Sequence, residues 1–271
     1  MNRLILLLIS SFFILHCSFN PLCCQELIKI ENKAFVPGEY FKFSVYYDSH
    51  VTGKVTAGVA TLEVKFEKSS IDGRSCYHVI GEGHTKGAFN LFFRVNDHFE
   101  SNIDEEYLVP WVFNRRTREG SYSYDDEVRF NQFSGAFSSQ RANKKMQVGT
   151  QDILSAFFFA RNYDFSLAKK GDTFPLGFML DDSVYTSVIM YAGKEEIETE
   201  LGKFRCLHFK PMVITGNVFS QPYPMDVWIT DDNNHMPIMG KSAVIIGSLK
   251  VELVEYKGLA NQPEALLDRK K

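Results

Sequence analysis

The sequence lacks the motifs by which the common enzyme classes are recognised. It contains no G-x-S-x-G nucleophile elbow, no H-E-x-x-H zinc helix and no phosphate-binding loop. Gly81-Glu82-Gly83 begins like a dinucleotide-binding loop, but the third glycine and the following helix are missing. Ser166-Leu167-Ala168-Lys169 has the S-x-x-K spacing without the other β-lactamase motifs. We therefore predict no catalytic residue, no cofactor, and a protein that is not an enzyme.

The chain also lacks a strong charge bias and any apolar run of the ~20 residues that a membrane span needs. The net charge is −3 and only Arg269-Lys270-Lys271 forms a basic run. We expect no nucleic-acid partner and no transmembrane span in the mature chain. What the chain does have is 24 phenylalanines and 12 tyrosines, which suit β-strands and an aromatic interior.

The N-terminus has the pattern of a secretory signal peptide. A basic Met1-Asn2-Arg3 is followed by apolar residues from Leu4 to Leu15, too few to span a bilayer. We predict a signal peptide over residues 1–24, with cleavage after Cys24 and Gln25 as the new N-terminus. The alternative is lipoprotein processing at one of the early cysteines, which would anchor the protein to an envelope membrane. Either route predicts an exported, periplasmic protein.

From residue 35 onward the hydrophobic pattern is mostly period two. Ala60, Leu62, Val64 and Phe66 alternate with polar residues, as in an antiparallel sheet with one wet face. Further strands are predicted at residues 41–47, 75–82, 89–100, 107–115, 120–130, 173–180, 183–191, 203–212, 225–230, 236–246 and 248–256. Short connections between them predict a mainly β fold: a single antiparallel meander forming a curved sheet or half-barrel.

Acidic turns are expected between the strands, and one helix interrupts them. The turns are Asp125-Asp126, Asp181-Asp182 and Asp231–Asn234, the last of which also offers oxygen ligands for weak calcium binding. Residues 151–162 have helical spacing, with Thr150 or Asp152 able to cap the start. We predict one β-rich domain over residues 25–257 around this helix, followed by a polar tail over residues 258–271.

Two Cys-x-His pairs, Cys76-Tyr77-His78 and Cys206-Leu207-His208, place a thiol and an imidazole on one face of a strand. Brought together they would form a Cys2His2 zinc set, and an exported protein could instead oxidise the thiols to a disulfide. The third interpretation is two buried thiols in separate strands. We predict the third: Cys76 and Cys206 buried, free and without metal.

The aromatic segment 88–93 contains the best candidates for contact with a ligand. Phe92 interrupts the alternation of the predicted strand, so that both of its faces are apolar. We assign ligand binding to five residues: Phe89, Phe92, Phe93, Trp111 and Trp228. The alternative is that these side chains fill the core.

Histidines and carboxylates suited to acid–base chemistry occur at Asp97-His98 and at Glu82 with His84. No nucleophile or oxyanion donor can be placed beside them from the sequence.

Ordered short motifs along the mature chain resemble those of a known family. They are Phe35-Val36-Pro37-Gly38-Glu39, Asp152-Ile153-Leu154-Ser155-Ala156, Gly202-Lys203-Phe204-Arg205-Cys206, Val227-Trp228-Ile229-Thr230-Asp231-Asp232 and His235-Met236-Pro237. Together they resemble domain of unknown function 3108, a family of exported envelope proteins of Gram-negative bacteria. The Trp228 hairpin is also similar to one in the periplasmic lipoprotein carriers, half-barrels that cup a hydrophobic ligand around helices. This chain departs from those carriers in its length and its single helix.

These observations lead to two expectations about function. The first is a non-enzymatic module that binds a lipid or another apolar envelope molecule. The second is a structural or assembly factor that acts through contacts with another envelope protein.

Overall fold

The computed structural model describes residues 26–49, 53–212, 223–243 and 248–270. The elements in chain order are β1 (Tyr40–Ser49), β2 (Gly53–Val64), β3 (Ser69–Ile71), β4 (Arg74–Thr85), α1 (Phe89–Phe92), β5 (Asn96–Asp104), β6 (Pro110–Glu119), β7 (Tyr122–Asn131), β8 (Ala136–Ser138), β9 (Asn143–Lys145), α2 (Ile153–Ala160), β10 (Thr173–Leu180), β11 (Ser183–Thr199), β12 (Gly202–Pro211), β13 (Met225–Thr230), β14 (Pro237–Ala243), β15 (Ser248–Lys257) and β16 (Leu266–Arg269). The predicted signal peptide, its cleavage after Cys24 and the alternative lipid anchor lie outside the described residues. None of the helices in these ranges is long and apolar enough to cross a membrane.

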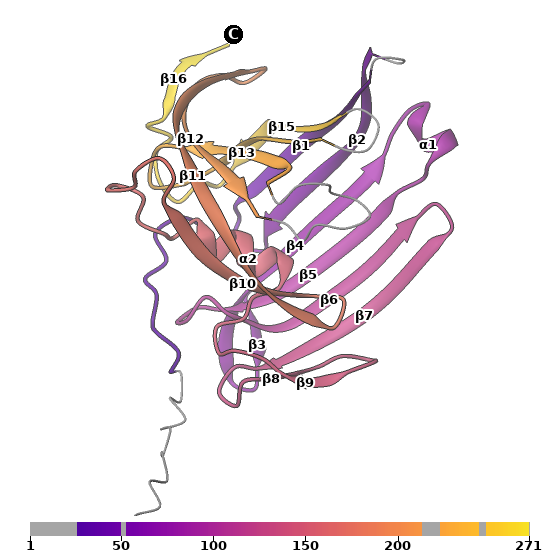
Figure 1. Ribbon diagram of the computed structural model, residues 1–271, viewed down its shortest axis with the longest axis vertical. Coiled ribbons are helices and arrows are strands. Elements are labelled where there is room, and N and C mark those ends of the chain that lie inside the picture. Colours follow the sequence, from indigo (N-terminus) through magenta and orange to yellow (C-terminus); the bar gives the residue numbers. More distant parts are fainter. Residues whose placement is uncertain (1–25, 50–52, 213–222, 244–247, 271) are drawn as a thin grey trace, which may run out of the picture.

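In these described ranges, the strands form one antiparallel sheet of 16 strands that curves strongly without closing on itself (Figure 1). Its order is β10-β11-β12-β13-β14-β15-β1-β2-β4-β5-β6-β7-β8-β9, while β3 pairs with β4 and β16 with β12. Almost every strand therefore lies beside its neighbour in the sequence. The predicted antiparallel meander with a curved sheet is confirmed.

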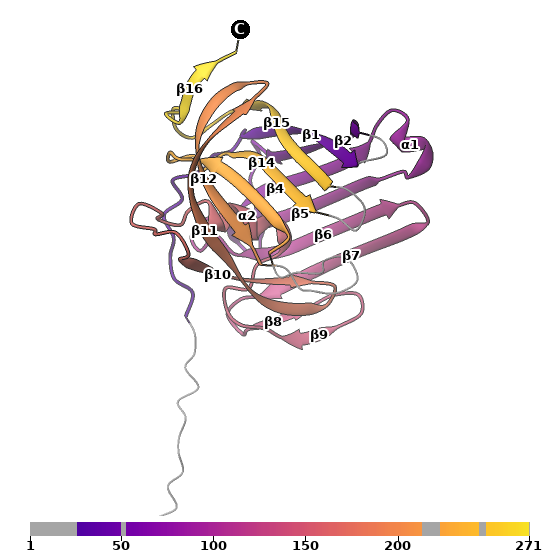
Figure 2. The same cartoon turned by 45° about the horizontal axis from the view of Figure 1, so that its top comes forward.

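The sheet consists of two wings that meet at the ladder between β1 and β15. The N-terminal wing runs from β1 to β9 and the C-terminal wing from β10 to β15. In the joining ladder Tyr40 lies opposite Lys257 and Asp48 opposite Ser248. Both ribbon views show α2 between the wings, where the chain passes from one outer edge of the sheet to the other (Figure 2). Helix α2 therefore lies on the concave side of the sheet, between the two wings.

Helix α2 begins where the sequence predicts a cap. The Asp152 carboxylate accepts hydrogen bonds from the backbone N–H groups of Leu154 and Ser155, both at 2.8 Å, and Ser155 Oγ accepts in return from the Asp152 N–H. This reciprocal capping box satisfies N–H groups that have no partner within the helix. Leu154 approaches β4 at Gly81, where a Cβ atom would lie 3.0 Å from the leucine. A glycine at this position lets the helix seat closely on the sheet.

A buried ion pair fixes the end of α2 to both wings. Arg161 donates to the two carboxylate oxygens of Glu39 at 2.6 and 2.8 Å, and both side chains are only 1% exposed. The same guanidinium donates to the carbonyls of Ala34 and Asn234 at 2.9 Å each. Because all three guanidinium nitrogens donate to acceptors inside the protein, the buried charge is compensated by the Glu39 carboxylate and backbone carbonyls.

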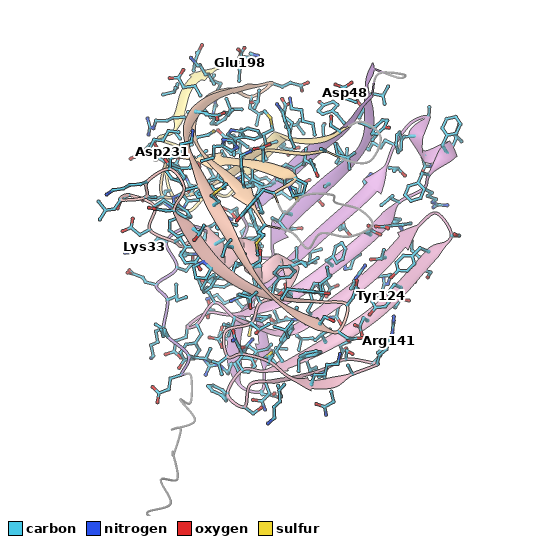
Figure 3. All side chains as sticks on the ribbon, viewed as in Figure 1. Lys33, Asp48, Tyr124, Arg141, Glu198 and Asp231 are labelled. Carbon is cyan, nitrogen blue, oxygen red and sulfur yellow. The ribbon has the colours of Figure 1, made fainter. Side chains whose placement is uncertain are left out.

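Hydrogen bonds from side chains connect the turn between β10 and β11 to the N-terminal wing. At the turn between β10 and β11, Asp181 accepts from Arg115 of β6 at 2.6 Å and the Asp182 carbonyl accepts from Lys144 of β9 at 2.8 Å. Close by, the Arg141 guanidinium lies over the Tyr124 ring, 4.1 Å from its centroid. Figure 3 labels both residues, near the outer strands of the N-terminal wing.

The acidic turns are partly as predicted. Asp181 and Asp182 have φ angles of 47° and 58°, typical of a tight hairpin turn, and residues 231–234 also form a turn. The predicted turn at Asp125-Asp126 is wrong, because both residues lie inside β7. Asp125 pairs with Arg118 at 2.7 Å on one face of β7. On the other face Asp126 accepts from the buried Tyr124 hydroxyl at 3.1 Å, so each carboxylate has a hydrogen-bond partner within the sheet.

The segment predicted as a polar tail takes part in the fold. Its strand β16 pairs with β12, with Arg269 opposite Gly202 and Leu266 opposite Phe204. Earlier in the segment, Asn261 donates its backbone N–H to the Asn234 side chain at 2.9 Å.

Candidate functional site

A cavity of about 390 Å³ lies between α2 and the C-terminal wing. We call it the α2 cavity. Its helix side is lined by Ile153, Ala156, Phe157 and Ala160. This spacing of i, i+3, i+4 and i+7 places the four residues on one face of a helix. The two alanines leave space where larger side chains would fill it.

The opposite wall is built by alternate residues of the strands. Phe209 of β12 and Val227 and Ile229 of β13 point into the cavity, as do Ser187 and Ile189 of β11. Successive side chains of a strand point to opposite faces, so each strand contributes every second residue. The wall is therefore almost wholly apolar.

The two polar groups at this cavity have partners inside the protein. The Ser187 hydroxyl donates to the Met212 carbonyl at 2.7 Å. The Arg161 guanidinium is held by Glu39 and by backbone carbonyls, as described above. With these groups engaged, the described lining offers apolar contacts rather than free hydrogen-bonding groups.

The opposite face of α2 is closely packed. Phe158 is fully buried among Val64, Val79 and Ile103 of the N-terminal wing, and the Phe35 ring meets it edge to face at 4.7 Å. Helix α2 thus has one packed side and one hollow side.

The structure does not bring the five predicted ligand-binding residues together, and none of them lines the α2 cavity. The predicted strand at 89–100 is wrong in its first part: residues 89–92 form the single turn α1, and β5 starts at Asn96. The backbone turns at Gly87, whose φ is 57°, and the Phe93 N–H donates to the Phe89 carbonyl at 2.9 Å. Phe92 and Phe93 are exposed at this end of the hairpin.

Trp228 lies on the face of β13 opposite the cavity, as its position between Val227 and Ile229 requires. Its ring stacks on His208 at 4.6 Å between centroids, and its Nε1–H donates to Glu195 at 2.9 Å. His208 is itself held between Glu195 at 2.9 Å and Asp226 at 2.7 Å. Trp228 therefore belongs to a packed polar cluster on the other side of the wall.

Trp111 lies in the N-terminal wing beside a different hollow. Its Nε1–H donates to Asp104 at 2.7 Å, and Arg74 pairs with the same carboxylate. Burial would raise the pKa of Asp104, but the hydrogen bonds from Arg74 and Trp111 outweigh it and hold that pKa below its usual range. The adjoining hollow, of about 620 Å³, is rimmed by polar residues such as Arg129 and Asn143.

Cys76 and Cys206 are buried free thiols, as predicted. They lie on β4 and β12, which five strands separate in the sheet. Burial raises the pKa of each thiol to about 12, so both stay protonated at neutral pH. In the part of the chain that the structure describes, no three His, Cys, Asp or Glu side chains are grouped as metal ligands.

The predicted acid–base candidates lie on β4 and β5. His98 is held between Glu82 at 3.0 Å and Glu100 at 2.7 Å. Partial burial lowers its pKa, but the hydrogen bonds to Glu100 and Glu82 outweigh this, so the pKa of His98 is raised. Both ring nitrogens are engaged, which suits an ion-paired surface histidine.

Comparison with known proteins identifies the family of this chain. Residues 42–254 match the model of a protein family of unknown function, DUF3108, and the chain belongs to that family. No curated protein matches the chain.

Among solved structures, the chain is similar to a β-barrel-like protein of the domain of unknown function DUF1849 from Brucella abortus. The two are 8% identical with a TM-score of 0.54, over 83% of this chain and 98% of the other, which shows a shared fold. Weaker matches are a candidate lipoprotein from Parabacteroides distasonis, 9% identical with a TM-score of 0.37, and a candidate exported protein with a YmcC-like fold from Bacteroides fragilis, 12% identical with a TM-score of 0.34. Each covers 84% of this chain and 99% of the other.

The cavity-lining residues were missed from the sequence for a simple reason. Attention to aromatic residues selected Trp228, whereas its less conspicuous neighbours Val227 and Ile229 line the cavity. A usable signal existed in α2, where Ala156 and Ala160 stand on a face that otherwise carries large apolar residues.

Proposed function

We propose that this protein is an exported cell-envelope protein that binds an apolar molecule in the α2 cavity. The observation that carries the proposal is the hollow side of α2: an apolar, partly enclosed space beside a helix whose other side is tightly packed. Its volume of about 390 Å³ falls within the ~300–1,000 Å³ range of small-molecule sites. The secretory pattern of residues 1–24 supports the exported location.

The lining favours a flexible hydrocarbon such as an acyl chain. The aromatic rings of Phe157 and Phe209 and the branched Ile189 and Ile229 give dispersion contacts without directional hydrogen bonds. A polar ligand would lose its hydration here without gaining partners. We therefore propose binding without catalysis.

A matched pair of substitutions on β11 tests this proposal. Ile189→Trp adds bulk inside the cavity, whereas Val188→Trp adds the same bulk on the opposite face of the same strand. A dansyl-labelled undecanoic acid serves as the fluorescent probe. We expect Ile189→Trp to weaken probe binding at least ~10-fold, because filling the site removes apolar contacts worth about 1.4 kcal/mol or more. Val188→Trp should bind as the unmodified protein does.

Thermal unfolding of the three proteins shows whether both variants are folded. If both variants fold and bind the probe equally well, the α2 cavity is not the site. If the unmodified protein does not bind the probe or any co-purified lipid, the proposed function is rejected.

The alternative function, assembly through strand pairing, receives less support from the sheet edges. Edge strand β9 has only three residues, Asn143–Lys145, and all are exposed and polar or basic. Edge strand β10 contains Pro175, and part of its edge is covered where the Gln151 carbonyl accepts from the Met179 N–H at 2.8 Å. Short, charged or covered edges are the usual protection against strand addition.

A further inference from the structure

The connection between β4 and β5 exposes large apolar side chains at the end of a long hairpin. We call residues 86–94 the tip. Leu91 is 84% exposed, Phe92 88% and Phe93 47%. Both ribbon views show α1 at the far end of β4 and β5, away from α2 (Figures 1 and 2). Single exposed apolar residues are common on proteins, but three in succession at a projecting end form a patch.

The tip is held in this conformation by hydrogen bonds. The Thr85 hydroxyl donates to the Asn90 side-chain oxygen at 2.9 Å and accepts from the Val95 N–H at 2.9 Å. The Phe89 ring packs against Tyr47, with 5.8 Å between centroids. Phe89 thus anchors the turn, and the turn directs Leu91 and Phe92 outward. Their exposure is a property of the ordered fold.

The neighbouring turn between β6 and β7 supports the tip. The Gly120 N–H donates to the Arg94 carbonyl at 2.8 Å. A Cβ atom at Gly120 would lie 3.0 Å from the Phe93 ring, so the glycine makes room for that ring. Tyr122 on the same turn is also exposed and stacks on Tyr124. An aromatic residue with a polar end beside the apolar tip is typical of a membrane–water interface.

Two basic residues bracket the apolar ones. Lys86 precedes them, Arg94 follows them, and both are exposed. Among the ion pairs of the described residues, neither side chain takes part. Each basic residue near an anionic bilayer surface contributes attraction that adds to apolar insertion. The two basic residues therefore suit the headgroup layer of an anionic membrane, and the apolar residues between them suit its acyl layer.

We propose that the tip inserts Leu91 and Phe92 into the interface of an anionic phospholipid bilayer, with Lys86 and Arg94 at its headgroups. A protein partner fits less well, because a stable interface needs about 800 Å² per partner with a complementary surface, and a narrow projecting turn offers neither. A bilayer requires no shape complementarity. This site is separate from the α2 cavity and does not depend on it.

Vesicle co-sedimentation tests the proposal with a matched control. The double variant Leu91→Ser/Phe92→Ser removes one leucine and one phenylalanine from the tip. Leu167→Ser/Phe133→Ser removes the same residue types from two other exposed positions, which are 87% and 60% exposed. With vesicles of phosphatidylethanolamine and phosphatidylglycerol, the tip variant should partition at least ~30-fold more weakly than the unmodified protein. The control variant should stay within about twofold, as expected for surface substitutions elsewhere.

Charge and depth are tested by two further variants. Lys86→Glu/Arg94→Glu should lose the preference for these vesicles over phosphatidylcholine vesicles. Phe92→Trp should show a blue-shifted emission with the anionic vesicles, quenched by brominated acyl chains. Equal binding by the tip and control double variants would overturn the proposal, as would an emission of the Phe92→Trp variant that brominated lipid leaves unaffected. So would an absence of vesicle binding together with crosslinking of the tip to one envelope protein. Probe binding in the α2 cavity should be unchanged in every tip variant.

Discussion

The two sides of α2 face the two wings of the same sheet and differ in packing. Toward the N-terminal wing, Leu154 and Phe158 fill the space against β4 and β5 with buried aromatic and aliphatic contacts. Toward the C-terminal wing, Ala156 and Ala160 leave the α2 cavity open. Protein interiors are normally packed without voids of this size. The N-terminal side therefore packs closely against the helix, and the proposed function places the ligand on the open C-terminal side.

The largest expected effect comes from breaking the connection that both wings share. Arg161→Met leaves the Glu39 carboxylate buried without its partner and frees the carbonyls of Ala34 and Asn234. Removing one partner of a buried ion pair costs about 3–5 kcal/mol. Urea unfolding should show this loss in the free energy of unfolding.

A surface pair serves as the control for that experiment. Arg129→Met removes an ion pair with Glu127, 2.8 Å long and exposed to solvent, and should cost no more than about 1 kcal/mol. Equal losses for Arg161→Met and Arg129→Met would show that the buried pair does not hold the two wings together.

Neighbouring phenylalanines on α2 measure the packing contrast directly. Phe158→Ala creates a cavity on the packed side and should destabilise the protein by about 3–5 kcal/mol. Phe157→Ala enlarges a space that already exists and should cost at least ~1 kcal/mol less. The free energies of unfolding decide between them. A greater loss for Phe157→Ala would contradict the assignment of packed and hollow sides.

The long strands and helix α2 were predicted from the sequence, because period-two and 3.6-residue patterns are local, whereas the short strands β3, β8, β9 and β16 were not. Phe89–Phe93 was assigned to a strand because its composition is apolar and aromatic, whereas its conformation depends on Gly87 and on hydrogen bonds to Thr85. Nothing in the local pattern distinguishes a buried phenylalanine from an exposed one.

The cavity could not be predicted for a different reason. Both faces of β13 carry large apolar side chains, so the alternation does not reveal whether Trp228 or Val227 faces the hollow. The Trp228 face is covered by its own core with Phe204 and Met239. The empty volume depends on how α2 sits relative to strands about 30 to 70 residues later in the chain.

The pH dependence of stability tests whether water reaches the Asp152 carboxylate that caps α2. Burial raises the pKa of Asp152 to about 6, against the hydrogen bonds from Ser101, Ser155 and Leu154 that lower it. The folded state therefore holds a proton that the unfolded state has released, and stability falls as pH rises between about 4 and 6. The shift corresponds to a loss of up to ~3 kcal/mol across that window.

Asp152→Asn keeps an oxygen that can cap the helix but cannot ionise. The unmodified protein should lose unfolding free energy between pH 4 and pH 6. In Asp152→Asn this loss should be smaller by roughly the same ~3 kcal/mol. The same pH dependence in both proteins would mean that Asp152 titrates normally and that the helix start is hydrated.

The smallest expected effect concerns the two thiols, one in each wing. Because burial raises the pKa of Cys76 and Cys206 to about 12, neither should react with a maleimide at pH 8 in the folded protein. Both should react after unfolding in urea, as measured by the mass of the intact protein. Rapid labelling of Cys206 alone in the folded state would show that the C-terminal wing opens more readily than the N-terminal wing.

The central claim, that the hollow side of α2 holds an apolar molecule, is tested most directly by native mass spectrometry. The unmodified protein and the Ile189→Trp and Val188→Trp variants are purified from the envelope of the host without added lipid. We predict an adduct of lipid size on the unmodified protein and on Val188→Trp, and its loss from Ile189→Trp. No adduct on any of the three, or the same adduct on all three, would contradict the account.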